Sequence, residues 1–318
     1  AASLSNLGII NRLRGDLEKA EKLQKDSLEI SKEISNRVGE ANSLGNLGNI
    51  AETRGDLEEA ERLYKESLAI EREIEYRPGE AASLLNLGLI YANRGDFENA
   101  ERLYKDALVI FEDIEQTNGL ITTITHLGLI AYHRGELEEA ERCFKKCLVT
   151  SQEIGNRYIE ARSLRNLAEI ERCRGKLENS ERLCNESITI SKDIGMKFIA
   201  TESLLILGNI AWERMELEEA ERFFKECLEI NREIGRSSGE AQSLLSLGNI
   251  ALGRGELEEA ESLFKESLEI NMEIGIPHGE ANSLHNLGLI AMFKGDLEEA
   301  ERFFKKRCHQ CRAGFNKY

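Results

Sequence analysis

The sequence predicts an all-α protein, a right-handed α-solenoid of eight antiparallel helix hairpins. The main observation is a period of 40 residues that runs through the chain without insertion or deletion. One leucine marks every repeat (Leu7, Leu47, Leu87, Leu127, Leu167, Leu207, Leu247 and Leu287), and one isoleucine follows it (Ile10, Ile50, Ile90, Ile130, Ile170, Ile210, Ile250 and Ile290). A single repeat of this size cannot bury its own apolar face, so neighbouring repeats must stack and share a core.

The first helix of each repeat, called the A helix here, is predicted from apolar residues at helical spacing. In the repeat at residues 41–80 these are Leu44, Leu47, Gly48, Ile50 and Ala51. They form one apolar stripe on a helix with about 3.6 residues per turn. Gly55 is expected to end this helix, because glycine readily adopts the left-handed conformation of a C-cap.

The second helix, called the B helix, is predicted to start at Asp56. Asp56 is an N-cap residue with Glu59 three positions later, which is the spacing of a capping box. The apolar and small residues that follow are Leu57, Ala60, Leu63, Tyr64, Ser67, Leu68, Ile70 and Ile74. We expect the small residues Gly48 and Ala60 to let the two helix backbones approach closely. A bulky side chain at either position should overpack the hairpin at a cost of ~1–3 kcal/mol.

Short polar links, such as residues 36–40, join each repeat to the next, so consecutive hairpins must be neighbours in space. We therefore expect residues 1–318 to form a single solenoid domain. Its repeats are predicted at about 1–40, 41–80, 81–120, 121–160, 161–200, 201–240, 241–280 and 281–306. The pattern is lost after residue 306, so residues 307–318 are expected to be a frayed or non-native tail. The pattern has already begun at residue 1, so a fragment of a longer array is expected.

Charge and composition narrow the class of partner. The chain has 58 acidic and 42 basic side chains, giving a net charge of −16. Such a surface repels phosphate backbones and anionic lipids, so neither a nucleic acid nor a membrane is an expected partner. A cytoplasmic protein is expected. Most of the seven cysteines replace apolar or small residues of the repeat and are expected to be inert buried thiols.

The repeat resembles a known family. Leu44, Leu47, Gly48 and Ala51, followed by Gly55, Ala60, Tyr64 and Ser67, resemble the signature of a tetratricopeptide repeat. The 40-residue length, with Gly-Glu-Ala at 39–41 and Leu-Gly-Asn at 47–49, is similar to the G-protein-signalling modulators of the Leu-Gly-Asn type and, more loosely, to kinesin light chains. The resemblance implies a superhelix whose A helices line a concave groove that binds peptides.

Amide side chains recur on the face of the A helices that the resemblance places in this groove. The sixth residue of the repeat is asparagine five times and the ninth three times (Asn6, Asn46, Asn86, Asn166 and Asn286; Asn49, Asn209 and Asn249). An amide both donates and accepts hydrogen bonds, so a ladder of amides can satisfy the backbone of an extended peptide. The alternative, which the spacing suits as well, is that these amides bond neighbouring helices or solvent.

The fifth repeat places three arginines, Arg162, Arg165 and Arg172, on one helix face. Guanidinium groups bind carboxylates through paired hydrogen bonds, so these residues are candidates for holding an acidic peptide. The alternative is that nearby acidic residues of the same repeat neutralise them as ordinary surface ion pairs. These acidic residues are Glu160, Glu169 and Glu171.

Aromatic and imidazole side chains occupy the same face in the neighbouring repeats. They are His126, Tyr132 and His133 in the fourth repeat and Trp212 in the sixth. Tyrosine and tryptophan are favoured binding anchors because they bury a large area at low entropic cost. For Trp212, packing against the neighbouring helix is an equally good interpretation.

Motifs for metals, cofactors or catalysis are not expected. His126 and His133 are too far apart for the i, i+4 pair that binds a metal, and the pair Cys308 and Cys311 lacks the second pair of a zinc site. No glycine-rich phosphate loop or Ser/His/Asp set occurs in the sequence. We therefore expect no cofactor, no metal and no enzymatic activity.

The sequence thus predicts a non-catalytic scaffold that binds an extended, acidic peptide segment of a protein partner in the groove of the A helices. The alternative is a regulatory sensor arm of a larger signalling protein, with an NTPase or protease outside this sequence. A third alternative is an array whose ends stack into filaments. The chain is expected to be a monomer or to associate weakly end to end.

Overall fold

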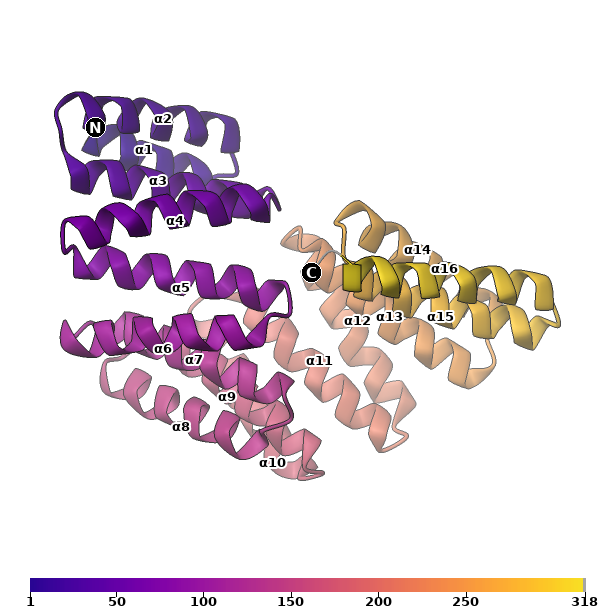
Figure 1. The fold of residues 1–318 in the computed structure, drawn as a ribbon. Coiled ribbons are helices and arrows are strands. Elements are labelled where there is room, and N and C mark those ends of the chain that lie inside the picture. The colour runs from indigo at the N-terminus through magenta and orange to yellow at the C-terminus, as the bar shows by residue number, and fades with distance from the viewer. Residues whose placement is uncertain (317–318) are drawn as a thin grey trace. The chain divides into compact units, whose positions relative to one another are not determined.

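The computed structural model describes the backbone of residues 1–316 and the side chains of residues 1–310, and all of its regular secondary structure is helical (Figure 1). The A helices are α1 (Ala2–Leu13), α3 (Arg37–Thr53), α5 (Arg77–Asn93), α7 (Thr117–His133), α9 (Arg157–Cys173), α11 (Lys197–Glu213), α13 (Ser237–Arg254) and α15 (Pro277–Lys294). The B helices are α2 (Leu17–Glu33), α4 (Leu57–Glu73), α6 (Phe97–Asp113), α8 (Leu137–Glu153), α10 (Leu177–Asp193), α12 (Leu217–Glu233), α14 (Leu257–Glu273) and α16 (Leu297–Asn316). The predicted α-solenoid of helix hairpins is confirmed.

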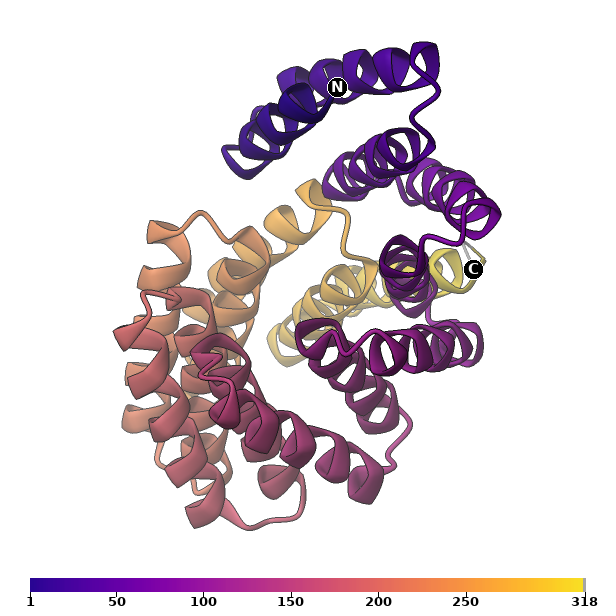
Figure 2. The same ribbon diagram turned by 90° about the vertical axis from the view of Figure 1, so that its left-hand side faces the viewer.

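The chain divides into two compact units, Ala1–Lys146 and Cys147–Tyr318, and each is described by itself. Consecutive helices pack against each other in chain order from α1 to α7 in the first unit and from α9 to α16 in the second, through the short connections visible in Figure 2. The expectation of one solenoid domain concerns the whole chain and stays a prediction. The expected tail begins inside α16, whose backbone is helical to Asn316, while residues 317–318 lie outside the described residues.

The turn between A and B helices follows from local chemistry. Gly55 has a φ of 81°, the left-handed conformation that the sequence predicts for the C-cap. Asp56 then accepts a hydrogen bond from the backbone N–H of Glu59 at 3.1 Å. The return bond of a capping box does not form, because the Glu59 carboxylate pairs with Arg62 and the N–H of Asp56 donates to Ala51 O. The prediction of Asp56 as the N-cap is therefore confirmed. The predicted return hydrogen bond, from the N–H of Asp56 to the Glu59 carboxylate, is wrong.

The glycine that recurs on the A helices leaves room for an aromatic ring of the B helix. A Cβ atom added to Gly48 would lie 2.6 Å from the ring of Tyr64, and one added to Gly88 would lie 2.4 Å from the ring of Tyr104. Both tyrosines are fully buried. The missing side chain thus makes room for an aromatic ring, a more specific role than the predicted approach of two backbones.

The fifth repeat fills the same space between its two helices with different residues. Ala168 stands where the other repeats have glycine, and Cys184 stands where Tyr64 and Tyr104 lie in theirs. Both are fully buried, so a larger residue on α9 faces a smaller one on α10. Ser180 replaces the usual alanine, and its hydroxyl donates to Ala168 O at 2.7 Å. The exchange keeps the core filled and satisfies the one added polar group.

The A helices form the more closely packed layer of each unit. Neighbouring A helices contact each other at α1–α3, α3–α5 and α5–α7 in the first unit, and at α9–α11 and α13–α15 in the second. Among the described helices of either unit, no two B helices make contacts of that extent. Neighbouring A helices therefore lie closer to each other than neighbouring B helices do.

Candidate functional site

Charged and aromatic side chains gather on the A helices of the second unit. We call it the arginine–aromatic cluster, and it consists of Tyr158, Arg162 and Arg165 on α9, Phe198 and Glu202 on α11, and Arg236 at the start of α13. All six side chains are half-buried. Three consecutive A helices therefore contribute to one surface.

Two aromatic rings form the base of the cluster. The ring centroids of Tyr158 and Phe198 are 6.2 Å apart, and the planes are tilted by 54°. The guanidinium of Arg162 lies over the Tyr158 ring at 5.6 Å, and that of Arg236 lies over Phe198 at 5.8 Å. These are cation–π distances, so each guanidinium is attracted to the ring beside it.

One carboxylate joins two of the arginines. Arg165 Nη2 lies 2.8 Å from Glu202 Oε2, and Arg236 Nη2 lies 2.8 Å from Glu202 Oε1. Glu202 thereby links α9, α11 and the residue before α13. The Nε atom of Arg165 is buried and has no hydrogen-bond partner in the described part of the chain. Arg165 therefore acts first as a structural tie between A helices.

Arg172, the third predicted arginine, is also held within the unit. It forms two hydrogen bonds with Glu169, of 3.1 and 2.6 Å, and a further ion pair with Glu213 of α11. Arg172 donates hydrogen bonds to the carboxylates of Glu169, the larger influence, and Glu213, and these bonds raise the pKa of Arg172 further above its ordinary value. The predicted neutralisation is thus observed at Glu169, whereas Glu160 pairs with Arg157 and Glu171 with Arg174.

Arg162 differs from its two neighbours. Its nearest polar contact is the hydroxyl of Tyr158, at 3.4 Å from Nη1. Within residues 1–310 it has no carboxylate partner. Of the three predicted arginines, only Arg162 therefore presents a guanidinium whose charge no acidic side chain in the described residues compensates.

The amides of the first unit are bonded within the array. Asn46 Nδ2 donates to Ser5 Oγ on the preceding A helix at 3.1 Å, and Asn49 Oδ1 accepts from the Tyr64 hydroxyl at 2.7 Å. Asn86 lies at the same position of α5 and is half-buried. Each bond uses one polar atom of an amide, so the structure shows the bonding to neighbours that was the alternative to peptide capture.

The fourth repeat places its rings on the preceding B helix. His126 stacks on Tyr104 at a centroid distance of 5.3 Å, and His133 stacks on Phe97 at 5.7 Å. Tyr132 meets the edge of His133 at 5.7 Å. These three predicted residues lie in the first unit and are not part of the arginine–aromatic cluster.

The remaining predicted residues lie in the second unit. Asn286 Nδ2 donates to Asn249 Oδ1 at 3.0 Å, which joins two A helices, and Asn209 is half-buried on α11. Asn166 is only 3% exposed, and its Nδ2 atom has no partner among the described residues. Trp212 is half-buried against a core cluster that includes Leu247 and Ile250.

Trp212 packs on the neighbouring A helix. A Cβ atom added to Gly253 of α13 would lie 3.2 Å from the indole, so the ring covers this glycine. This is the helix-packing interpretation that the sequence left open. Because the side chain is half-buried, part of the indole remains on the surface of the A helices.

Four members of the arginine–aromatic cluster are absent from the predicted site residues: Tyr158, Phe198, Glu202 and Arg236. A signal was present, since Tyr158 and Phe198 occupy one repeat position in two consecutive repeats, where other repeats have Val38, Pro78 and Asn118. Aromatic residues at one position in two adjacent repeats indicate a local surface, because packing of the repeat does not require a ring at that position.

Within residues 1–310, no three His, Cys, Asp or Glu side chains come together as a metal site would require, and the Cys311 thiol lies outside the described side chains. Burial raises the pKa of the Cys184 and Cys227 thiols to about 12, so both stay protonated. None of the described helices is long and apolar enough to cross a membrane.

Comparison of the sequence with protein families gives a consistent assignment. The MalT-like TPR region matches residues 87–277, which is more than half of the chain. A second tetratricopeptide repeat family matches residues 1–73 and 39–113, and a third matches residues 281–306. No curated protein matches the chain in sequence. The likeness to Leu-Gly-Asn-type modulators and kinesin light chains stays a prediction.

Several solved structures share the fold at low sequence identity. The quorum sensor NprR from B. thuringiensis is 14% identical, with a TM-score of 0.72 over 97% of this chain and 86% of that chain. A Rap protein complexed with Competence and Sporulation Factor is 12% identical, with a TM-score of 0.71 over 100% of this chain and 99% of that one. A third similar structure is a STAND signal-transduction ATPase with a tetratricopeptide repeat sensor, from Pyrococcus horikoshii. It is 18% identical, with a TM-score of 0.64 over 97% of this chain and 47% of that chain.

Proposed function

Because the chain belongs to the MalT-like family of tetratricopeptide repeat regions, we propose that it is a non-catalytic scaffold that binds an extended peptide segment of a partner protein on its A helices. The observation that carries the proposal is the arginine–aromatic cluster. It is the place where half-exposed rings and a guanidinium without a carboxylate partner share the A-helix surface of one unit. Similar structures support it, since the Rap protein of like fold is complexed with Competence and Sporulation Factor.

The chemistry of the cluster favours an acidic ligand. A carboxylate that approaches Arg162 gains a charge-assisted hydrogen bond and finds no acidic side chain competing for that guanidinium within the described residues. Tyr158 and Phe198 provide apolar surface beside it. Arg165 and Arg172 are paired internally, so we assign them to shaping the surface.

The amides extend this surface along the A helices. Asn209 on α11 lies one helix from Arg162, and Asn249 and Asn286 are bonded to each other further along the second unit. Each amide in that bond has a second polar atom, which can meet the N–H or C=O of an extended peptide. We propose that these amides contribute affinity for any peptide backbone, whereas Arg162 selects acidic sequences.

The experiment measures binding of fluorescently labelled peptides by anisotropy. A panel of extended acidic peptides is compared with peptides in which glutamine replaces each acidic residue. We expect Arg162→Glu to weaken binding of the acidic peptides about tenfold or more, because it replaces an attraction with a repulsion. Binding of the neutral peptides should change little.

The control is Arg182→Glu on α10, which changes the net charge equally but lies on a B helix, where Arg182 pairs with Glu186. Circular dichroism melts of both variants establish that the fold is retained. If Arg182→Glu weakens acidic peptides as much as Arg162→Glu does, general charge repulsion explains the effect and the assigned site is wrong.

A sensor arm is the second candidate function. The observation that favours it is the likeness to the sensor-bearing STAND ATPase, of which this chain spans 47%. In that case peptide binding to the A helices would regulate an NTPase in the same protein. The complete protein sequence tests this directly, because it either contains a Walker-type phosphate loop beside the repeats or does not.

A further inference from the structure

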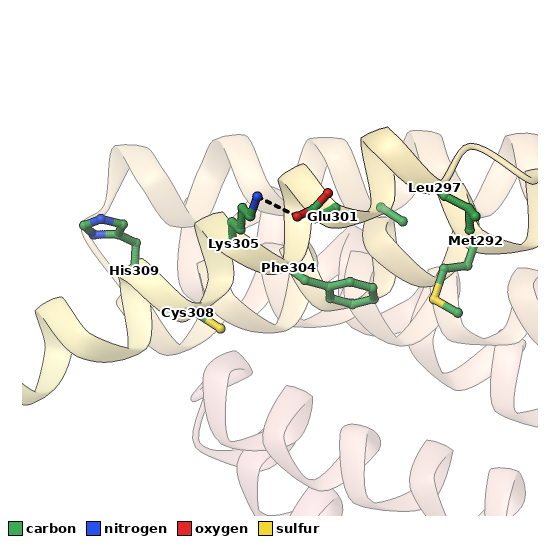
Figure 3. Close-up of a pocket in the computed structure, with 8 residues that line it drawn as sticks. Met292, Leu297, Glu301, Phe304, Lys305, Cys308 and His309 are labelled. Carbon is green, nitrogen blue, oxygen red and sulfur yellow. Dashed lines mark ion pairs between the residues drawn. The ribbon is translucent and has the colours of Figure 1, made fainter.

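Glu202 of α11 has no basic partner along its own helix. A carboxylate on a helix pairs with basic side chains that lie three or four positions away. Around Glu202 these positions hold Phe198, Ile199, Leu205 and Ile206. Elsewhere in the second unit such local pairs do form, as between Glu301 and Lys305 of α16, which lie 2.6 Å apart (Figure 3). The carboxylate of Glu202 therefore finds its partners on other segments.

Both oxygens of this carboxylate are used by arginines. Oε2 lies 2.8 Å from Nη2 of Arg165 on α9, and Oε1 lies 2.8 Å from Nη2 of Arg236 before α13. The exposed fractions of the three side chains are 21% for Arg165, 23% for Glu202 and 34% for Arg236. Because the three groups are partly buried, their attraction is screened less than that of a fully exposed pair. One carboxylate thus holds two guanidinium groups.

The repeat does not require these three charges. Apart from Arg162, the residues equivalent to Glu202 in the other repeats are uncharged (Ala2, Asn42, Ala82, Thr122, Gln242 and Asn282). No other repeat has an arginine at the position of Arg165 or of Arg236. The three charges are therefore a local feature of this surface. Gln242 also shows that the next repeat accommodates a glutamine at the position of Glu202.

The position of Arg162 brings a bound ligand close to this group of charges. Arg162 and Arg165 are three residues apart on α9, where the Cβ atoms of such a pair lie about 5–6 Å apart. An acidic residue that binds Arg162 therefore has its neighbour in the peptide within reach of Arg165. A second acidic side chain at this place meets the carboxylate of Glu202, which already pairs with Arg165 and repels a like charge.

We propose that Glu202 determines the specificity of the arginine–aromatic cluster by occupying the place of a second ligand carboxylate, an inference that rests on the proposed binding of an acidic peptide. The cluster takes one acidic residue at Arg162 and gains no affinity from another acidic residue beside it. The ligand class is a peptide whose acidic residues stand singly among uncharged ones. Tyr158 and Phe198 contact the uncharged neighbours.

The test compares two labelled peptides by fluorescence anisotropy. One carries a single glutamate in a background of serine and leucine, and the other carries two adjacent glutamates in the same background. The wild type should bind both with dissociation constants within about twofold of each other. Glu202→Gln removes the competing charge, so it should bind the peptide with two glutamates about tenfold more tightly, while the single-glutamate peptide changes less than threefold. A merely structural role of Glu202 would shift both peptides alike.

Glu213→Gln is the matched control. It removes the same charge from α11, roughly 16 Å further along the helix. Its partner Arg172 keeps its two hydrogen bonds with Glu169, so the ratio of the two dissociation constants should stay at the wild-type value.

A double variant tests whether the gain comes from the released arginines. Glu202→Gln combined with Arg236→Asn takes one of them away, so it should lose most of the tenfold gain. Asparagine is compatible with this position, which Asn36 and Asn156 occupy in two other repeats. Circular dichroism melts establish that each variant is folded.

The outcomes separate this inference from the proposed function. A wild type that binds the peptide with two glutamates tenfold more tightly than the other would overturn the inference without any variant. A ratio that Glu202→Gln leaves unchanged, or that Glu213→Gln changes equally, would also overturn it, while Arg162-dependent binding of both peptides leaves the proposed function intact. Binding to the wild type that persists in Arg162→Glu would overturn the proposed function and this inference together.

Discussion

Arg94, directly after helix α5, forms an ion pair with Glu61 of helix α4 in the preceding repeat. Tyr91 donates its hydroxyl to the same carboxylate at 3.0 Å, and Lys65 approaches it at 2.5 Å from within α4. Glu61 and Arg94 are 15% and 22% exposed, so this pair is better shielded than the pair of Arg62 and Glu66 along α4, which are 53% and 48% exposed. Such pairs join one hairpin to the next at the edge of the apolar core.

Removing this link should lower stability measurably. We expect Arg94→Ala to reduce the free energy of unfolding by roughly 1–2 kcal/mol, because it breaks a partly buried, charge-assisted bond. Arg62→Ala is the control, since Arg62 is 53% exposed and pairs along its own helix, where such pairs contribute about 0.3–0.5 kcal/mol. Urea denaturation measures both, and equal losses would contradict the special role of the inter-repeat pair.

Acid should weaken the same link. Burial raises the pKa of Glu61, but hydrogen bonds from Lys65, Arg94 and Tyr91 outweigh burial and lower the pKa to about 2. A lowered pKa in the folded state gives stability that is complete above the ordinary value of 4.5 and is lost as the pH falls towards 2. The stability difference between wild type and Glu61→Gln should therefore shrink over this pH window. A difference that is constant with pH would contradict the argument.

Glu71 is expected to destabilise the folded chain at neutral pH. It is 3% exposed, its Oε1 accepts a hydrogen bond from Ser67 at 3.0 Å, and its Oε2 has no partner among the described residues. Burial raises its pKa. Glu71→Gln keeps the bond to Ser67 and removes the buried charge, so it should stabilise the protein by roughly 1 kcal/mol at pH 7. The gain should vanish in acid, where Glu71 is protonated in both states; a gain independent of pH would disprove the mechanism.

Two glycine substitutions should have opposite effects. Gly88→Ala places a Cβ atom 2.4 Å from the Tyr104 ring, so it should cost ~1–3 kcal/mol through overpacking. Gly45→Ala has its nearest neighbour, Ser67 Oγ, at 3.7 Å, so it should stabilise α3 by ~0.5–1 kcal/mol. Thermal melts compare the two variants, and a loss of stability in both would show that the ring above Gly88 is not the cause.

Met215 should be replaceable by glycine with a gain. Its φ is 63°, the left-handed conformation, at a position where Gly55 and Gly255 lie in other repeats. Met215→Gly should stabilise the turn by roughly 1 kcal/mol, because the side chain no longer strains the backbone. Gly255→Met is the reverse control and should lower the melting temperature. If neither change affects the melt, the turn does not restrain these hairpins.

Local chemistry made much of the fold predictable. Leu47 and Ile50 recur with the 40-residue period, and Gly55 and Asp56 mark the turn between helices through their own conformational preferences. Each of these signals acts within a few residues, where spacing alone predicts geometry. The hairpins and their order could therefore be read from the chain.

The candidate site was less predictable because it depends on which repeats become neighbours. Arg165 pairs with Glu202 on another helix, whereas the sequence suggested partners within its own repeat. Sequence spacing along one helix cannot reveal a contact that the stacking of two helices creates. The amides illustrate the same limit, since Asn46 and Asn286 bond residues of the preceding repeat.

The central claim is that an acidic peptide binds the A helices of the second unit at the arginine–aromatic cluster. The most direct test is photo-crosslinking of a benzophenone-labelled acidic peptide to the wild-type chain, followed by mass spectrometry of the crosslinked fragments. We predict crosslinks on α9 and α11, near Tyr158 and Phe198, that disappear in Arg162→Glu. Crosslinks confined to the B helices α10 and α12, or unchanged in that variant, would contradict the claim.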